Sequence, residues 1–176
     1  FERAQVYFFK EDYNRALNDC NKCFTTDGLE SISNKARELR VKTYEKLKRW
    51  KEAIADLDII LKDVPKMRIL SGTTKKNLIQ RAEYYAKLKD YDKALTSVDF
   101  VLHIEPKRTE ALLLKAHLAK DKQDYRLALN CYNQLIALDY SISGWFRERA
   151  EVYKKLGNEA AAQRDIKAAT DLEKSQ

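Results

Sequence analysis

Two cysteines lie close together near the start of the sequence, at Cys20 and Cys23, in a CxxC spacing. This spacing supports redox chemistry within a βαβ unit, and zinc binding where a second pair accompanies it. Neither context is present, because no strand pattern surrounds the pair and the third cysteine, Cys131, is remote in sequence. We therefore expect both cysteines to pack in the core of a helical protein.

The other residue types that perform catalysis show no arrangement that would support it. His103 and His117 are the two histidines, and no acid or nucleophile is arranged around them. The sequence has no glycine-rich phosphate loop and no nucleophile elbow, and its carboxylates have the spacing of helix surface charge. The sequence therefore predicts a protein that is not an enzyme and that binds no cofactor and no metal.

Basic residues are the strongest indication of a binding surface. The chain carries a net charge of +7 and has a pI of about 9.2. Residues 34–74 alone hold 11 Lys and Arg against 6 Asp and Glu. Such a surface attracts an acidic protein segment. Charged helix faces are also commonly solvated without any partner, and Glu38 and Glu45 flank the lysines of this region.

Length and composition favour one helical domain. The 176 residues suit a single domain, and 35% charged residues with only four Gly and two Pro are typical of a helix-rich protein. No apolar run approaches the roughly 18 residues of a membrane span, and no signal-peptide pattern is present. An odd number of cysteines favours a reducing compartment, so we expect a cytoplasmic protein without membrane insertion. Because the sequence begins at Phe1 and its one methionine is Met67, we expect a fragment of a longer chain.

Internal repetition is the most informative feature of the sequence. Five alanines are separated by 37, 41, 34 and 34 residues, and an aromatic residue precedes four of them by three positions. Twelve positions before each alanine lies a small or β-branched residue, preceded by a basic residue and in four cases followed three positions later by a tyrosine, which gives the motif RAxxY. The alanines are Ala16, Ala53, Ala94, Ala128 and Ala162, and the basic and small pairs are Arg3–Ala4, Arg40–Val41, Arg81–Ala82, Lys115–Ala116 and Arg149–Ala150.

This spacing predicts a pair of antiparallel helices in each repeat. The small residue and the tyrosine share one face of a first helix, where a small side chain lets a neighbouring helix approach closely. A short polar turn leads to a second helix, on which the alanine and the residues four and seven positions later form an apolar stripe. A hairpin of this kind cannot bury both its faces alone, so neighbouring hairpins must stack. The stripe residues are Cys20 and Cys23, Leu57 and Ile60, Val98 and Val101, Tyr132 and Leu135, and Ile166 and Ala169.

These residues resemble the tetratricopeptide repeat family, whose helix-turn-helix unit is 34 residues long. The resemblance covers nearly the whole chain as one domain, with approximate repeats at 1–33, 34–74, 75–108, 109–142 and 143–176. Ala119 departs from the pattern where a tyrosine is expected, and Glu159 departs where the turn aromatic is expected. The resemblance implies an all-α fold, a right-handed superhelical solenoid of antiparallel helix pairs. It also implies a scaffold or adaptor whose first helices line a concave groove for a peptide or helix of a partner protein.

The resemblance also indicates which residues would contact that partner. Lysines dominate the expected groove positions of the second repeat, so we expect an acidic partner segment. Chaperone-tail adaptors of this family use lysine, asparagine and arginine at set places, but here Phe1, Gln5, Leu39 and Gln80 take four of them and only Lys76 matches. Another co-chaperone activity remains open. The expected groove residues are Lys35, Leu39, Lys42, Lys46, Lys76, Gln80, Glu83, Lys87, Leu113, Leu114, His117, Lys120, Arg147 and Lys154.

Other interpretations remain open at this stage. Other helical repeats bind single-stranded RNA, and the basic charge of this chain fits that alternative. The chain could also be a regulatory or targeting segment of a larger protein, or it could self-associate through an end repeat. The connector at 66–74 has Gly72 in an expected SGTT turn. It is either a longer helix or a loop that spaces two repeats, or it contacts a partner through Lys66 and Arg68.

Overall fold

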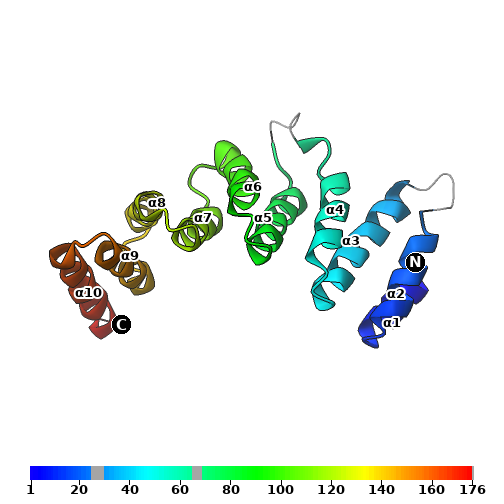
Figure 1. Ribbon diagram of the computed structural model, residues 1–176, viewed down its shortest axis with the longest axis horizontal. Helices are drawn as coiled ribbons and strands as arrows, with labels where there is room; N and C mark the ends of the chain where they lie inside the picture. The colour runs from blue at the N-terminus through cyan, green and yellow to red at the C-terminus, as the bar shows by residue number, and fades with distance from the viewer. Residues whose placement is uncertain (25–29, 65–68, 176) are drawn as a thin grey trace. The chain divides into compact units, whose positions relative to one another are not determined.

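The computed structural model describes residues 1–24, 30–64 and 69–175, and these residues form ten α-helices and no strand (Figure 1). The all-α prediction is therefore confirmed. The helices are α1 (Glu2–Phe9), α2 (Tyr13–Lys22), α3 (Glu30–Lys46), α4 (Trp50–Ile60), α5 (Gly72–Lys87), α6 (Tyr91–Ile104), α7 (Thr109–Asp121), α8 (Tyr125–Leu138), α9 (Ser143–Lys155) and α10 (Glu159–Lys174).

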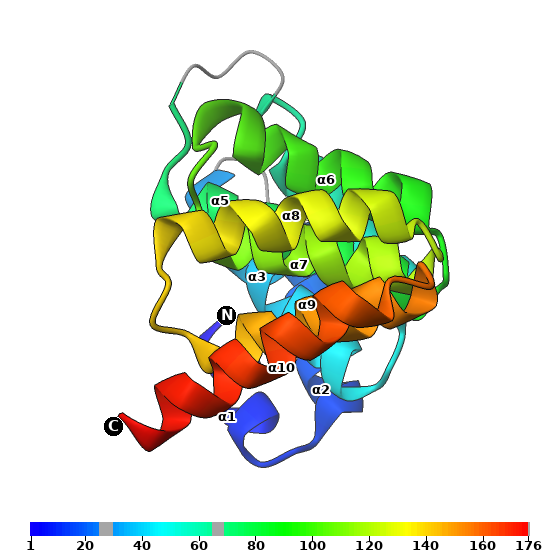
Figure 2. The ribbon, with the colours of Figure 1, turned by 90° about the vertical axis from the view of Figure 1, so that its left-hand side faces the viewer.

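Two compact units divide the chain, and each is described on its own. The first unit, residues 1–89, contains the hairpins α1–α2 and α3–α4 followed by α5. The second unit, residues 90–176, contains α6 followed by the hairpins α7–α8 and α9–α10. Figure 2 shows α7 beside α8 and α9 beside α10, each pair joined by a short turn.

The repeated small residues lie where helices cross. The alanine of every second helix is completely buried, at Ala16, Ala53, Ala94, Ala128 and Ala162. The small residue of every first helix is also at most 2% exposed. A side chain of this size lets two backbones approach closely and leaves room for a larger neighbour such as Tyr132, which is fully buried.

The apolar stripe of the second helices is mostly buried, with three exceptions. Cys23, Ile60 and Ile166 are only partly buried, whereas the other seven stripe residues are buried. The expectation that both cysteines pack in the core is therefore correct for Cys20 and wrong for Cys23. Cys23 forms the C-cap of α2, where the helix ends and its Sγ donates to the carbonyl of Asp19.

Helices α3 and α5 begin earlier than the expected repeat boundaries. Helix α3 begins at Glu30, ahead of the boundary expected at 34, and α5 begins at Gly72, ahead of the boundary expected at 75. The SGTT segment is the start of α5 and not a separate turn, because the Ser71 hydroxyl caps the helix by accepting from the Thr74 N–H at 3.1 Å. Lys66 and Arg68, the two connector residues expected to contact a partner, lie outside the described residues.

Each turn between the two helices of a repeat uses the same backbone device. One residue adopts a left-handed conformation, with φ between 55° and 74°, directly before the N-cap of the second helix. In four of the five turns the N-cap is Asp or Asn, and its side chain accepts from the third N–H of the helix. The left-handed residues are Glu11, Lys48, Lys89, Gln123 and Gly157.

We predict opposite effects for two glycine substitutions in the last repeat. Gly157 has φ +74°, so Gly157→Ala should lower the free energy of unfolding by about 1 kcal/mol, because a Cβ strains the left-handed conformation. Gly144 lies inside α9, and a Cβ there meets nothing within 4 Å, so Gly144→Ala should stabilise by up to about 1 kcal/mol. Urea unfolding of both variants tests this, and a stabilising Gly157→Ala would contradict the turn geometry.

Candidate functional site

The first unit carries a set of exposed lysines on the first helices of its repeats. These residues lie on α3 and α5, and none of them forms an ion pair with any described residue. We call this set the lysine surface; it consists of Lys35, Lys42, Lys46, Lys76 and Lys87. An exposed and unpaired lysine keeps its full charge available for an approaching anion.

Leu39 was expected to be exposed beside these lysines, and this expectation is wrong. Leu39 is 8% exposed and packs in a core cluster with Ala4 and Cys20, against which Phe1 and Phe8 also lie. At 100° per residue Leu39 is rotated about 40° from Lys35 around α3, which brings it to the contact with the first repeat. Leu39 therefore stabilises the stacking of the first two repeats.

Gln80 forms part of a polar contact between α3 and α5. The Tyr84 hydroxyl donates to Glu45 Oε2 at 2.8 Å, and the Gln80 amide donates to the same oxygen at 3.1 Å. Burial and the neighbouring Glu45 carboxylate both raise the pKa of Tyr84 above its ordinary value. The ring of Tyr84 also lies 5.3 Å from that of Trp50. Glu45 is thus engaged with α5. Glu83 is the one acid among the expected groove residues, and it is exposed.

In the second unit, two of the three Lys and Arg side chains that were expected in the groove form ion pairs with carboxylates. Lys120 donates to Glu148 and, at 2.8 Å, to Glu151, both on α9. Glu148 also accepts from the hydroxyl of Tyr132, at 3.1 Å. Burial opposes the ionisation of Glu148, but the hydrogen bonds from Lys120 and Tyr132 outweigh it and lower the pKa of that carboxyl. The charge of Lys120 therefore stabilises the stacking of α7 and α9 and is not free for a partner.

The other residues of the second unit that were expected in the groove are ion-paired, exposed or partly buried. Arg147 forms a bidentate pair with Glu173 at 2.6 and 2.9 Å, whereas Lys154 and His117 are exposed. Leu113 is partly buried and packs against the core cluster of α7 and α8, and Leu114 is also partly buried.

The difference in ion pairing between the two units agrees with their charge balance. Residues 1–89 hold 20 Lys and Arg against 13 Asp and Glu, while residues 90–176 hold 14 of each.

The basic residue of the RAxxY motif has a structural role that the sequence analysis did not assign. In three repeats the guanidinium of this arginine forms a bidentate ion pair with an aspartate 16 positions later, on the second helix of the same hairpin. In the last repeat the two distances are both 2.7 Å, with the Arg149 side chain 17% exposed and that of Asp165 8% exposed. The three pairs are Arg3–Asp19, Arg40–Asp56 and Arg149–Asp165.

Two repeats lack this aspartate and take a carboxylate from the preceding second helix. Ser97 and Cys131 occupy the positions 16 residues after Arg81 and Lys115. Arg81 instead pairs with Asp58 on α4 at 2.9 Å, and Lys115 pairs with Asp99 on α6 at 2.6 Å.

Where the internal aspartate is present, the neighbouring helix offers an uncharged acceptor. Arg40 donates to the Asn21 amide oxygen at 2.6 Å, and Arg149 donates to that of Asn133 at 2.8 Å. The basic residue of each repeat from the second to the fifth therefore has a carboxylate partner, either inside its hairpin or in the preceding second helix. A regular aspartate at the sixteenth position was visible in the sequence of three repeats and could have identified these pairs.

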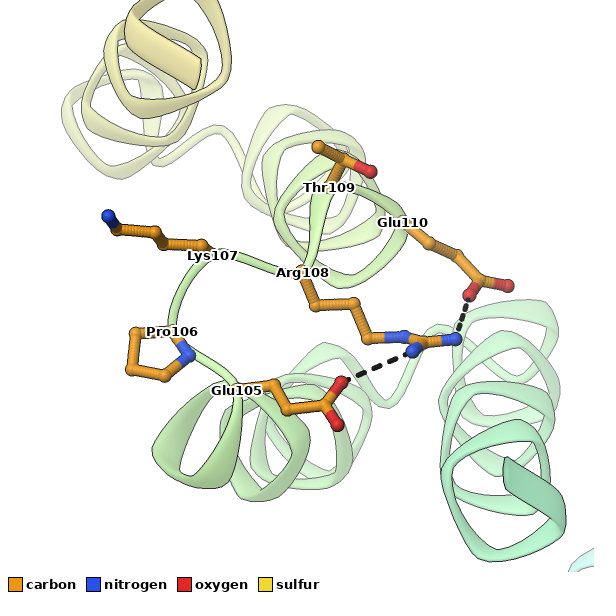
Figure 3. A pocket seen from close by; sticks show the side chains of 6 residues that line it. All are labelled: Glu105, Pro106, Lys107, Arg108, Thr109 and Glu110. Atoms are coloured by element: carbon orange, nitrogen blue, oxygen red, sulfur yellow. Dashed lines mark hydrogen bonds and ion pairs between the residues drawn. The ribbon is translucent and has the colours of Figure 1, made fainter. Parts of the chain in front are cut away.

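The pocket at the turn between α6 and α7 is built around an arginine that two carboxylates already pair. It has a volume of about 710 Å³ and is lined by the six residues from Glu105 to Glu110 (Figure 3). Arg108 donates to Glu105 at 3.2 Å and to Glu110 at 2.8 Å, and Lys107 points away from them. Both carboxylates already hold the guanidinium, so these ion pairs stabilise the turn beside which the pocket lies.

The cysteines show no features of a reactive or metal-binding site. Burial raises the pKa of both Cys20 and Cys131 to about 11, which keeps them as neutral thiols. Within residues 1–24, 30–64 and 69–175, no group of His, Cys, Asp and Glu is arranged to hold a metal ion. No helix in the same ranges is long and apolar enough to cross a membrane.

Comparison with known proteins identifies the repeat. A tetratricopeptide repeat family model matches residues 109–141, the α7–α8 hairpin. Similar solved structures include MamA, with a TM-score of 0.76, 14% identity, and coverage of 98% of this chain and 95% of that chain. Residues 109–141 form a tetratricopeptide repeat. Another similar structure, MamA 41-end from Desulfovibrio magneticus RS-1, has a TM-score of 0.76, 14% identity, and coverage of 99% and 93%.

A further similar structure is YrrB, described as a TPR protein with an unusual peptide-binding site. It has a TM-score of 0.71 and 17% identity, and the match covers 96% of this chain and 82% of that chain. No curated protein matches the chain in sequence. The chain therefore shares the fold of these proteins at low sequence identity, and this fold is an all-α helical repeat solenoid.

We predict that loss of one motif carboxylate destabilises the last repeat. Asp165→Asn should lower the free energy of unfolding by about 2 kcal/mol, because it leaves the largely buried Arg149 without its charged partner. The matched control is Asp171→Asn on the same helix, where the carboxylate is exposed and the expected change lies within about 0.5 kcal/mol. Urea denaturation measures both, and equal effects of the two variants would refute the role of the pair.

We also predict an acid dependence that arises from Glu148. Its pKa is lowered in the folded protein, so its stabilising contribution is present above the unfolded value of about 4.3 and is lost as the pH falls through the folded value. Glu148→Gln should therefore reduce stability at pH 7 and flatten its fall in mild acid. Thermal unfolding between pH 3 and pH 7 measures this, and an unchanged slope in the variant would contradict it.

Proposed function

We propose that this protein is a scaffold whose first unit binds an acidic segment of a partner protein on the lysine surface. A tetratricopeptide array is in general a protein–protein interaction scaffold. The observation that carries the proposal is the contrast between the units: the lysines on α3 and α5 are exposed without ion pairs to described residues, whereas Lys120 and Arg147 in the second unit are paired. Among the expected groove residues, the exposed cations without described ion pairs lie mainly in the first unit, with Lys154 as the exception in the second, and this supports the first unit as the binding half.

The kind of ligand is supported by the fold and by the charge. YrrB, which shares the fold, is described as having a peptide-binding site, and this supports a peptide as the ligand here. An exposed lysine–carboxylate contact contributes only about 0.2–1 kcal/mol, so several contacts are needed and binding should weaken as salt rises. Charge of this kind mainly accelerates association and selects acidic partners.

A chaperone carboxyl-terminal tail is not the acidic segment that we propose. The family positions that hold such a tail carry Phe1, Gln5, Leu39 and Gln80 in place of the required side chains. Leu39 is buried, and Gln80 is engaged with Glu45.

We also propose a cytoplasmic location for the protein. Cys20, Cys23 and Cys131 are free thiols, which supports a reducing compartment.

Binding of single-stranded RNA is the competing function, and the tyrosines argue against it. RNA-binding surfaces stack bases on open aromatic rings beside cations. Here the protein's own guanidiniums lie over the repeat tyrosines: Arg15 lies 5.6 Å from the centre of Tyr7, and Arg49 lies 4.9 Å from that of Tyr44. These rings are therefore occupied by intramolecular contacts and do not form a stacking platform.

We predict that reversing the charge of the lysine surface removes partner binding without unfolding the protein. The variant combines Lys35→Glu, Lys42→Glu, Lys46→Glu and Lys76→Glu, all at exposed positions. Partner proteins captured by the wild type from nuclease-treated lysate should be lost, since the surface then repels an acidic segment. Mass spectrometry of the bound proteins measures this, with circular dichroism to confirm the helicity.

A control with the same change in net charge separates the surface from the overall charge. Arg126, Lys155, Arg164 and Lys167 are exposed in the second unit, and their replacement by Glu should leave capture intact. If both charge variants retain the wild-type proteins, the lysine surface is ordinary solvated surface. If binding disappears with nuclease treatment alone, RNA replaces protein as the proposed ligand.

A further inference from the structure

A large aromatic side chain is exposed at the end of α1. Phe9 is 81% exposed, although contact of a phenylalanine ring with water is unfavourable. Its ring is held in place by an edge contact with Phe8 at 6.0 Å, and Phe8 in turn contacts Tyr13 at 5.8 Å. Phe8 also packs against the core cluster that contains Leu39. Phe9 is therefore a positioned apolar surface and not the tip of a loop.

The repeat register places Phe9 on the same face as the lysine surface. Phe9 follows Ala4 by five positions, as Lys46 follows Val41 and Lys87 follows Ala82. Equivalent positions of stacked repeats form a row across their first helices. The row in the first unit therefore consists of Phe9, Lys46 and Lys87, with an aromatic ring at one end and, beyond it, two lysines that pair with no described residue.

The exposure of Phe9 is a property of this row. Val6, on the same helix, corresponds to Thr43 and Tyr84, which are at most 3% exposed, and Tyr84 contacts the preceding repeat through Glu45 and Trp50. Val6 therefore belongs to the face on which repeats stack. In contrast, Lys46 and Lys87 stay exposed even though a repeat precedes each of them.

We propose that the acidic partner segment carries an aromatic or large aliphatic side chain that packs on Phe9. This inference rests on the proposed function of the lysine surface. Charge contacts with exposed lysines are individually weak, whereas a buried apolar anchor supplies most of the affinity at many interfaces. The partner is thus bipartite, with an apolar anchor over α1 and carboxylates over α3 and α5.

The row also sets the order of groups within the partner. Successive first helices touch through side chains, Leu39 with Ala4 and Tyr84 with Glu45. An extended peptide that crosses these helices therefore places its apolar anchor at one end and its carboxylates beyond it.

The test is calorimetric titration of the whole chain with three synthetic peptides at low salt. They are hexaglutamate with blocked ends, and the same peptide extended by one leucine at its amino end or at its carboxyl end. We expect one leucine peptide to bind about tenfold more tightly than hexaglutamate. Phe9→Ala should abolish this advantage and leave hexaglutamate binding unchanged, whereas Phe9→Leu should keep the advantage. Ile59→Ala is the matched control, because Ile59 is 45% exposed on the second helix α4.

The outcomes separate this inference from the proposed function. If hexaglutamate binds and is weakened by Lys46→Glu, but leucine adds nothing or its advantage survives Phe9→Ala, the apolar anchor is refuted and the acidic partner stands. If hexaglutamate does not bind, both are refuted. If Ile59→Ala removes the leucine advantage as Phe9→Ala does, the effect is not located at α1 and the inference also fails.

Discussion

Close approach of helices at alanine is the constraint on which the rest of this structure depends. Each second helix carries a fully buried alanine, and each first helix carries a small residue that is at most 2% exposed. Small buried residues leave room for bulky neighbours, as in the cluster where Tyr132 packs with Ala116, Ala119 and Ala128. The fixed spacing of crossings then fixes which residues of the first helices face outward.

Charge is arranged to preserve that geometry. A basic residue partly buried beside a helix crossing is costly unless a carboxylate accompanies it. Arg40 and Arg149 find one inside their own hairpin, whereas Arg81 and Lys115 find one on the preceding second helix. A carboxylate inside the hairpin joins the two helices of a repeat, and a carboxylate outside it joins consecutive repeats. The replacement of aspartate by Ser97 and Cys131 therefore moves an ion pair to another interface and does not delete it.

The period of the alanines predicted the fold well, because burial at a crossing depends on side-chain size, which is visible in sequence. The candidate site was predicted less well. Leu39 and Gln80 lie close to the lysines around their helices. Whether such a position is exposed depends on how the neighbouring repeat packs, and the sequence of one helix does not show this. The pairing of Lys120 was equally hidden, since Glu148 and Glu151 lie on the next repeat. Helices α3 and α5, with 17 and 16 residues, are longer than α7 and α9, with 13 each, so their starts at Glu30 and Gly72 precede the boundaries expected from the period.

The contrast between the two units bears on why the lysines are unpaired. A chain that holds 14 acidic and 14 basic residues in its second unit can pair its first-helix cations across repeats, as Lys120 does with Glu148. The first unit has seven more basic than acidic residues, and Glu45, the carboxylate between α3 and α5, accepts from Tyr84 and Gln80. Stability alone does not require an excess of cations on one face, because like charges repel and lower the stability of the folded chain. An acidic ligand that relieves this repulsion therefore stabilises the first unit as it binds, and its affinity includes that relief.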